Sequence, residues 1–183
     1  MYQDLLVWNL FLDKFNDVSY MSDIDWSSSS VLELFTDSAG GSTKGCGSYF
    51  QGKWTFLKWP EEWSGTDILK DITYLEMIPI ALSVYLWGNL FLKKKILINS
   101  DNKAVVEILN SKTSKSVRVM SLVRHIVYWS LLSNVHIKGQ YVPDCNNVLA
   151  DCISRRKFQK FKDLALSADT YPAVIPVEFW SLL

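Results

Sequence analysis

Four acidic residues, Asp37, Glu76, Asp101 and Asp151, stand in or beside apolar segments of the chain. A carboxylate buried among apolar side chains is costly unless it is paired or binds a cation. Several carboxylates together form the oxygen ligand set that hard divalent cations such as Mg²⁺ prefer. Two such cations, about 3.5–4 Å apart, activate water and stabilise the leaving oxygen of a phosphodiester. The four acids therefore predict a two-metal site for phosphodiester hydrolysis, although each acid alone also fits a turn or a helix cap.

The elements expected around these acids would bring them to one edge of a sheet. Apolar runs bounded by turn residues predict strands at 31–37, 46–51, 53–59, 93–102 and 135–142. Helical spacing predicts helices at 74–92, 103–110, 116–134 and 146–161, the last opened by asparagines suited to capping. Asp37 and Asp101 then end strands, whereas Glu76 and Asp151 fall in the first turns of helices. This order predicts an α/β fold with a mixed sheet and helices on its faces, in which sites form at the carboxyl ends of strands.

Length and composition are those of one globular domain with extensions. The chain has 183 residues, of which 49% are hydrophobic and 21% charged, so it can fill a sizeable core. Residues 1–30 predict an amphipathic helix and a linker that includes a serine run at 27–30. Residues 31–158 would form the main domain, and residues 159–183 a C-terminal extension.

The net charge is zero, whereas free-standing nucleic-acid binders usually carry a basic excess. A nucleic-acid substrate would therefore require affinity from metal ions or from a covalently attached neighbour.

The cysteines and the apolar segments favour an intracellular protein, cytoplasmic or nuclear. Three scattered cysteines without a CxxC pair argue against a disulfide framework or a zinc site. The first fifteen residues include Asp4 and Asp13 and no cleavage site, so a signal peptide is not expected. Residues 74–92 are apolar enough for a membrane span, but Glu76 and Pro79 within them favour a helix buried in a core. No membrane partner is expected.

The segments around the four acids resemble the motif blocks of ribonucleases H from reverse-transcribing elements. The blocks are Thr36-Asp37-Ser38-Ala39, Leu75-Glu76, Ser100-Asp101-Asn102 and the segment NVLADCISR at 147–155, which is the most specific of them. Residues 71–80, residues 114–120 and the tail from Phe158 onward are further similar to tyrosine-recombinase retrotransposons of the DIRS kind. The resemblance covers roughly residues 5–180.

This resemblance implies a ribonuclease H-like fold with a five-stranded mixed sheet and helices on both faces. It also implies endonucleolytic hydrolysis of the RNA strand of RNA–DNA hybrids during reverse transcription. Asp37 would bridge two Mg²⁺ ions, with Mn²⁺ as an alternative metal. Asp151 would help hold the ion that activates water, while Glu76 and Asp101 would hold the other.

The same resemblance implies partners beyond the metal. Nucleic-acid contacts are expected from Ser38, Gly41, Thr73, Asn102, Lys115 and Arg155. A reverse transcriptase domain would precede this chain in its polyprotein, and a recombinase would follow it.

Several residues depart from the family pattern. Gln140 takes the place of a mobile histidine in the loop before the last helix, and glutamine is neither acid nor base near neutral pH. His125 and His136 are expected to be packed or surface residues, and the tryptophans to serve packing rather than base stacking. Two alternatives remain: a catalytically silent module of the same fold that binds protein or nucleic acid, and an integrase-like enzyme. The segment 147–155 speaks against the integrase, whose acid set ends in glutamate.

Overall fold

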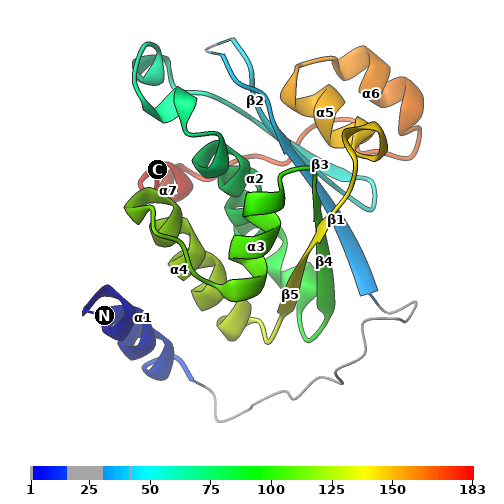
Figure 1. The fold of residues 1–183 in the computed structure, drawn as a ribbon. Coiled ribbons are helices and arrows are strands. Elements are labelled where there is room, and N and C mark those ends of the chain that lie inside the picture. Colours follow the sequence, from blue (N-terminus) through cyan, green and yellow to red (C-terminus); the bar gives the residue numbers. More distant parts are fainter. Residues whose placement is uncertain (1, 16–30, 42) are drawn as a thin grey trace.

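The computed structural model describes residues 2–15, 31–41 and 43–183, and its centre is a five-stranded sheet (Figure 1). The strands are β1 (Val31–Ser38), β2 (Gly45–Phe50), β3 (Lys53–Lys58), β4 (Lys95–Ser100) and β5 (His136–Tyr141). They lie in the order β3-β2-β1-β4-β5. Strands β1, β2 and β3 pair antiparallel, whereas β1, β4 and β5 pair in parallel. The carboxyl ends of β1 and β4, where Asp37 and Asp101 lie, are therefore neighbours.

A tight hairpin joins β2 and β3 through Gln51-Gly52. Both residues have positive φ angles, 46° and 86°, as a two-residue turn that matches the twist of its strands requires. Phe50 pairs with Lys53 across this turn. The two predicted strands of the hairpin are confirmed to within one residue at each end.

Three helices cover one face of the sheet: α2 (Ile72–Trp87), α3 (Lys103–Ser111) and α4 (Val117–Leu132) (Figure 1). Helix α2 packs on β1, β2 and α4, and the main core lies between them. Among the described residues, Ile72–Phe91 is the segment long and apolar enough to cross a membrane. Because 72% of this apolar stretch is buried inside the fold, its burial favours the interpretation as a core helix.

Two short helices, α5 (Val148–Ser154) and α6 (Phe158–Leu164), cover the opposite face and enclose a second, smaller core. The prediction of one continuous helix over 146–161 is wrong. Arg156 adopts a left-handed conformation with φ 61°. The amides of Arg156 and Lys157 bond back to the carbonyls of Ile153 and Cys152, which is a helix-terminating motif usually built on glycine.

The C-terminal segment packs back onto the fold. The Ala173 amide donates to the Trp54 carbonyl on the edge strand β3, with an N···O distance of 2.8 Å. The short helix α7 (Val177–Trp180) inserts Phe179, which is fully buried in the main core. The Tyr74 hydroxyl donates to the Leu183 carbonyl at 3.1 Å. The sequence predicts a boundary between the main domain, which ends at residue 158, and a C-terminal extension that begins at residue 159. That the main domain folds without the extension remains a prediction.

Helix α1 (Tyr2–Leu12) lies against α4, where Asp4 and Arg124 form an ion pair of 2.8 Å. The predicted helix is present, but its predicted amphipathic character is wrong. Helix α1 buries none of its residues, and side chains such as Tyr2, Leu5 and Leu12 are more than half exposed. The predicted linker with the serine run lies outside the described residues.

The sheet order, the strand directions and the helices on both faces confirm the predicted architecture, an α/β fold with a five-stranded mixed sheet. Short 3-10 turns complete it: η1 (Glu61–Trp63), η2 (Ile68–Lys70), η3 (Gly88–Phe91) and η4 (Asp144–Asn146). The ladder between β1 and β4 ends at the pair Phe35–Asn99. Beyond it the sheet opens at the carboxyl ends of two parallel strands, where α/β sheets form their sites.

Candidate metal centre

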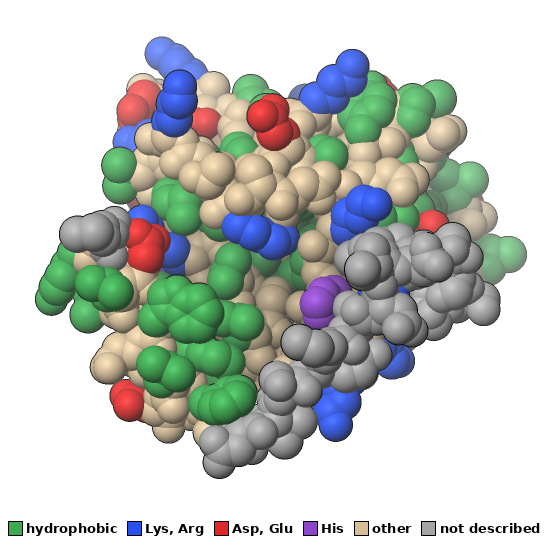
Figure 2. All heavy atoms as spheres, turned by 60° about the horizontal axis from the view of Figure 1, so that its bottom comes forward, with side chains coloured by type: hydrophobic (Ala, Val, Ile, Leu, Met, Phe, Trp, Pro, Cys, Tyr) green, Lys and Arg blue, Asp and Glu red, His purple; other side chains and the backbone are tan. Residues whose placement is uncertain are grey.

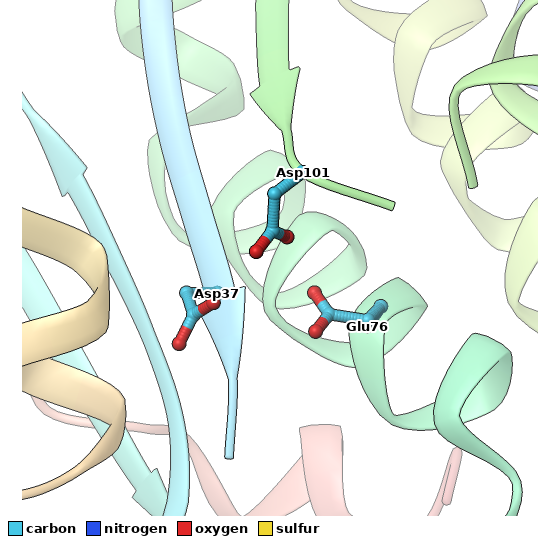
Figure 3. Close-up of side chains that lie close together, drawn as sticks. All are labelled: Asp37, Glu76 and Asp101. Carbon is cyan, nitrogen blue, oxygen red and sulfur yellow. The ribbon is translucent and has the colours of Figure 1, made fainter. Parts of the chain in front are cut away.

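Three of the predicted carboxylates meet where β1 and β4 separate. Asp37 comes from β1, Glu76 from α2, and Asp101 from the residue that follows β4. Each offers one carboxylate oxygen, and these oxygens lie within 4.8 Å of one another. Figure 3 shows the three side chains pointing toward a common point. The fold thus brings together three of the four acids to which the sequence drew attention.

Two polar side chains set the position of Glu76. The Asp71 carboxylate caps α2 by accepting a hydrogen bond from the Tyr74 amide at 3.0 Å. This cap starts the helix earlier than predicted, so Glu76 lies in its second turn and the prediction of a first-turn position is wrong. The Ser38 hydroxyl donates to the Leu75 carbonyl at 2.7 Å. This bond ties the end of β1 to the turn of α2 that carries Glu76.

Burial makes these carboxylates unfavourable as uncompensated anions. Glu76 is 5% exposed and Asp37 is 3% exposed. Loss of hydration, followed by the charges of Asp37 and Asp101, raises the pKa of Glu76 to about 9. Loss of hydration also raises the pKa of Asp37 to about 6, against the hydrogen bond from Ser154. The pKa of Asp101 is raised as well, chiefly by burial.

The donor set fits a hard divalent cation. All three side chains offer carboxylate oxygens, which Mg²⁺ and Mn²⁺ prefer as ligands. The Oε2 atom of Glu76 is buried and has no hydrogen-bond partner among the described residues. A buried polar atom without a partner is costly, and a cation at the common point would supply one. These residues therefore fit an oxygen-ligated metal, without a preference between the two ions.

Asp151 stands beside this group but outside it. It lies in the first turn of α5, as predicted. One carboxylate oxygen accepts a hydrogen bond from the Arg155 guanidinium, and the other lies 3.7 Å from Lys157 Nζ. Its negative charge contributes to the raised pKa values of Asp37 and Asp101. Asp151 is therefore close enough to act on both acids, while two cationic side chains are its present partners.

Two residues that the sequence did not single out hold α5 against the site. Ser154 is fully buried, and its hydroxyl donates to the Asp37 carboxylate. Gly47 on β2 allows close approach, since a Cβ atom there would lie 2.5 Å from Ile153 Cγ2. The motif at 147–155 includes Ser154, so the sequence could have indicated that this serine belongs to the site. No local pattern marks Gly47, because its role depends on a helix that is distant in sequence.

Three predicted nucleic-acid contacts already have partners within the chain. The Ser38 hydroxyl bonds to the backbone of α2. The Asn102 side-chain oxygen caps α3 by accepting from the Ala104 amide at 3.0 Å. Arg155 pairs with Asp151. A nucleic acid would therefore have to share or replace these bonds, and the contacts remain predictions.

The other three predicted contacts are open to solvent to different degrees. Gly41 is exposed in the loop after β1 with a φ of 99°. Lys115 is exposed between α3 and α4, and Thr73 is partly exposed in the first turn of α2. Their accessibility is compatible with binding, and these three contacts remain predictions.

The loop before α5 is shorter than predicted. Gln140 lies inside β5, paired with Asn99 of β4, so the interpretation that it lies in the loop before the last helix is wrong. The parallel ladder continues past it and holds it in the sheet. His125 packs on Trp129 within α4, with ring centroids 5.5 Å apart, and His136 begins β5. Neither histidine belongs to the carboxylate group.

The tryptophans near the site serve packing, as expected. Trp59 is 1% exposed and stacks on Trp63, with ring centroids 5.8 Å apart. Its Nε1 atom donates to the Ala39 carbonyl at 2.9 Å. This bond fixes the start of the loop that follows Asp37.

Two solved structures are similar to this chain. One is the N-terminal RNase H domain of a Mycobacterium tuberculosis protein fused to maltose-binding protein; it is 14% identical, with a TM-score of 0.49, and the match covers 75% of this chain and 97% of that one. The other is RNase H1 from the halophilic archaeon Halobacterium salinarum; it is 14% identical, with a TM-score of 0.48, covering 73% of this chain and 98% of that one. No protein-family model and no curated protein matches the chain. We therefore derive its function from the side chains of the site.

Without divalent cations, the free energy of unfolding is expected to fall between about pH 5 and pH 8. Glu76 has a pKa of about 9 in the folded protein against 4.5 as the ordinary value. The folded state therefore retains a proton that the unfolded chain has lost, and rising pH favours unfolding. If Mg²⁺ is held by the native cluster, it should raise the melting temperature, more so at pH 8, where protons compete less.

Thermal melts with EDTA and with Mg²⁺ at several pH values measure both effects. The Glu76→Gln variant should show a smaller pH slope in EDTA than the wild type. A metal-free melting temperature that rises toward pH 8 in the wild type would contradict the raised pKa of Glu76.

Proposed function

We propose that this chain is a ribonuclease H that hydrolyses the RNA strand of RNA–DNA hybrids by a two-metal mechanism. The observation that carries the proposal is the convergence of Asp37, Glu76 and Asp101 at the opening of the sheet. These residues belong to three of the motif blocks that resemble retroelement ribonucleases H. The sequence motifs and the geometry of the site therefore identify the same three side chains on separate grounds.

Within this proposal, Asp37, Glu76 and Asp101 would hold one divalent cation, and Asp37 with Asp151 a second. When bound, such a pair activates water and stabilises the leaving oxygen of a phosphodiester. The chain itself provides a buried floor of Asp37 and Glu76, with Asp101 and Asp151 partly exposed above it. Nucleic acid would approach from the exposed side, where Arg155 lies beside Asp151 and could contact the backbone phosphates.

The proposed biological context is reverse transcription in an element of the DIRS kind. The resemblance extends beyond the acids to residues 71–80 and 114–120, which supports this narrower assignment. A reverse transcriptase domain before this chain and a recombinase after it would be its covalent partners. We also propose an intracellular location, cytoplasmic or nuclear. None of the three cysteines, all within the described residues, forms a disulfide, which supports a reducing compartment.

The test is cleavage of an end-labelled RNA–DNA hybrid with Mg²⁺ or Mn²⁺, with duplex DNA and duplex RNA as controls. We expect cuts in the RNA strand of the hybrid only, lost in EDTA and in Asp101→Asn. The matched control is Asp163→Asn, which removes an exposed acid on α6 and should leave cleavage unchanged. A folded wild type that binds hybrid without cutting it would favour the silent binding module instead.

Hybrid binding by the isolated chain is expected to be weak, with a micromolar or higher Kd and a shallow salt dependence. The net charge is zero. On the face shown in Figure 2, Lys and Arg side chains are scattered among hydrophobic and acidic ones. Each phosphate contact contributes about 0.9 to the salt slope in duplex DNA, so few contacts give a shallow slope.

Fluorescence anisotropy at several salt concentrations, with Asp37→Asn to prevent cutting, measures this binding. Adding Arg155→Gln should lower the slope by about one. Adding Lys162→Gln, which changes an exposed residue of α6, should not. Nanomolar affinity with a steep slope would contradict this expectation and indicate a basic binding surface on the chain.

A further inference from the structure

Helix α5 carries Asp151, yet its seven residues are too few to form a stable helix alone. A two-metal site requires Asp151 at a set distance from Asp37, which lies on a different element. Some contact must therefore fix the start of α5 relative to β1. Ser154 and Ile153 anchor its last turn through Asp37 and Gly47, so the first turn needs an anchor of its own.

Asn147 provides that anchor. It is the residue before α5 and is 1% exposed. Its side-chain Nδ2 donates to the Thr36 carbonyl at 2.8 Å in a fully buried hydrogen bond. Thr36 lies one residue past the last pair between β1 and β4 and directly before Asp37. Asn147 thus occupies the place where the two strands separate.

The backbone of the same residue holds the other acid. The Asn147 carbonyl accepts a hydrogen bond from the Asp151 amide at 3.0 Å. One residue therefore bonds both to the neighbour of Asp37 on β1 and to Asp151 on α5. The side chain makes no capping hydrogen bond within the described chain, so the expected cap is not its role.

The burial of Asn147 is costly, which argues that its role is positional. Its Oδ1 atom is buried without a hydrogen-bond partner among the described residues. Leaving a buried acceptor unsatisfied costs about 1–3 kcal/mol in general, so an apolar side chain would serve packing alone better. What an apolar side chain could not do is hold α5 to the Thr36 carbonyl.

We propose that Asn147 is a positioning residue, which sets Asp151 against Asp37 and so determines whether the second cation is held. This inference rests on the proposed two-metal function. Partners that orient metal ligands without touching the metal typically change metal affinity or activity by about 10–100-fold when removed. Loss of Asn147 should therefore affect the second cation more than the first, whose ligands Asp37, Glu76 and Asp101 all lie outside α5.

The test compares three full-length variants. Asn147→Ala removes the bond to Thr36. Asn147→Ser removes it too, because a hydroxyl is shorter than an amide, but places a good helix cap before α5 and so protects folding. Asn110→Ala is the matched control: Asn110 joins α3 to β5 through two bonds with the Gly139 backbone, of 2.9 and 3.1 Å. Neither α3 nor β5 carries one of the four acids.

Three measurements test the positioning role of Asn147. Hydrogen exchange, run without metal, should speed up in residues 150–154 of both Asn147 variants and not in Asn110→Ala. Titration with Mn²⁺, followed by electron paramagnetic resonance, should show the first ion bound nearly as in the wild type and the second at least about tenfold more weakly. In cleavage, kcat should fall by a similar factor with KM little changed.

The outcomes separate the two proposals. A wild type that binds no Mn²⁺ at this centre overturns the proposed function. Unchanged exchange in α5, or unchanged binding of the second ion in the Asn147 variants, overturns the positioning role alone. Equal losses in Asn147→Ser and Asn110→Ala would also overturn it, because general destabilisation would then explain the result.

Discussion

Replacing Glu76 by glutamine is expected to abolish metal-dependent cleavage and to raise the melting temperature of the metal-free protein. Glu76 is 5% exposed, and one of its oxygens has no hydrogen-bond partner among the described residues. Its ionised form is opposed by burial and by two neighbouring carboxylates. A neutral side chain of the same shape removes that repulsion but is a much weaker metal ligand. Loss of a ligand should lower kcat by at least about 10³-fold, or about 4 kcal/mol.

Three measurements follow this variant: cleavage of labelled hybrid, thermal melting in EDTA, and the shift of the melt on adding Mg²⁺. In EDTA the melting temperature should rise by a few degrees, since about 1 kcal/mol corresponds to roughly 2–4 °C in a protein of this size. The Mg²⁺ shift should shrink. Glu62→Gln, which changes an exposed acid in η1, controls for the loss of a charge. Retained cleavage would show that Glu76 is not a ligand, and a lower metal-free melting temperature would contradict the expected relief of its unfavourable burial.

Much of the centre could be predicted because it depends on local signals and on one rule of topology. Apolar runs predict the strands, and the acids at the ends of two strands indicate the edge of the sheet where those strands end. The carboxyl ends of parallel strands meet at one edge of a sheet, so Asp37 and Asp101 had to be neighbours once β1 and β4 paired in parallel. Glu76 was recognisable as an acid in an apolar helix.

The position of Asp151 could not be predicted in the same way. It depends on Asn147, Ser154 and Gly47, whose partners are distant in sequence. The end of α5 was missed for a related reason. Arg156 adopts the left-handed conformation that usually marks a glycine, so the chain ends a helix without the residue that signals it. Tertiary contacts, not local propensity, place the fourth acid.

The packing of the C-terminal segment could not be predicted from local sequence patterns either. Its apolar residues are sparse and irregular, and a sequence pattern cannot reveal that Phe179 enters a core formed by elements distant in sequence. In the structure Phe179 packs beside Tyr85, with ring centroids 5.8 Å apart. The preceding residues bond to β3; for example, Trp54 Nε1 donates a hydrogen bond to the Asp169 carbonyl at 2.7 Å. Such cover protects an edge strand that would otherwise offer unpaired backbone groups.

Removing residues 166–183 is therefore expected to unfold the chain or leave it prone to aggregation, although the sequence pattern assigns 159–183 to an extension.

The finer test is Phe179→Ala, since truncation of a fully buried phenylalanine usually costs about 3–5 kcal/mol. At roughly 2–4 °C per kcal/mol, the melting temperature should fall by roughly 6–20 °C. Val177→Ala is the control on the same short helix, because Val177 is 81% exposed and should change the melt little. Helix α2, which carries Glu76, forms part of the core that Phe179 enters, so Mg²⁺ should stabilise the Phe179→Ala variant less than the wild type. If the truncated chain melts where the full chain does and still responds to Mg²⁺, the tail is a separable extension and residues 31–165 suffice to hold the carboxylates together.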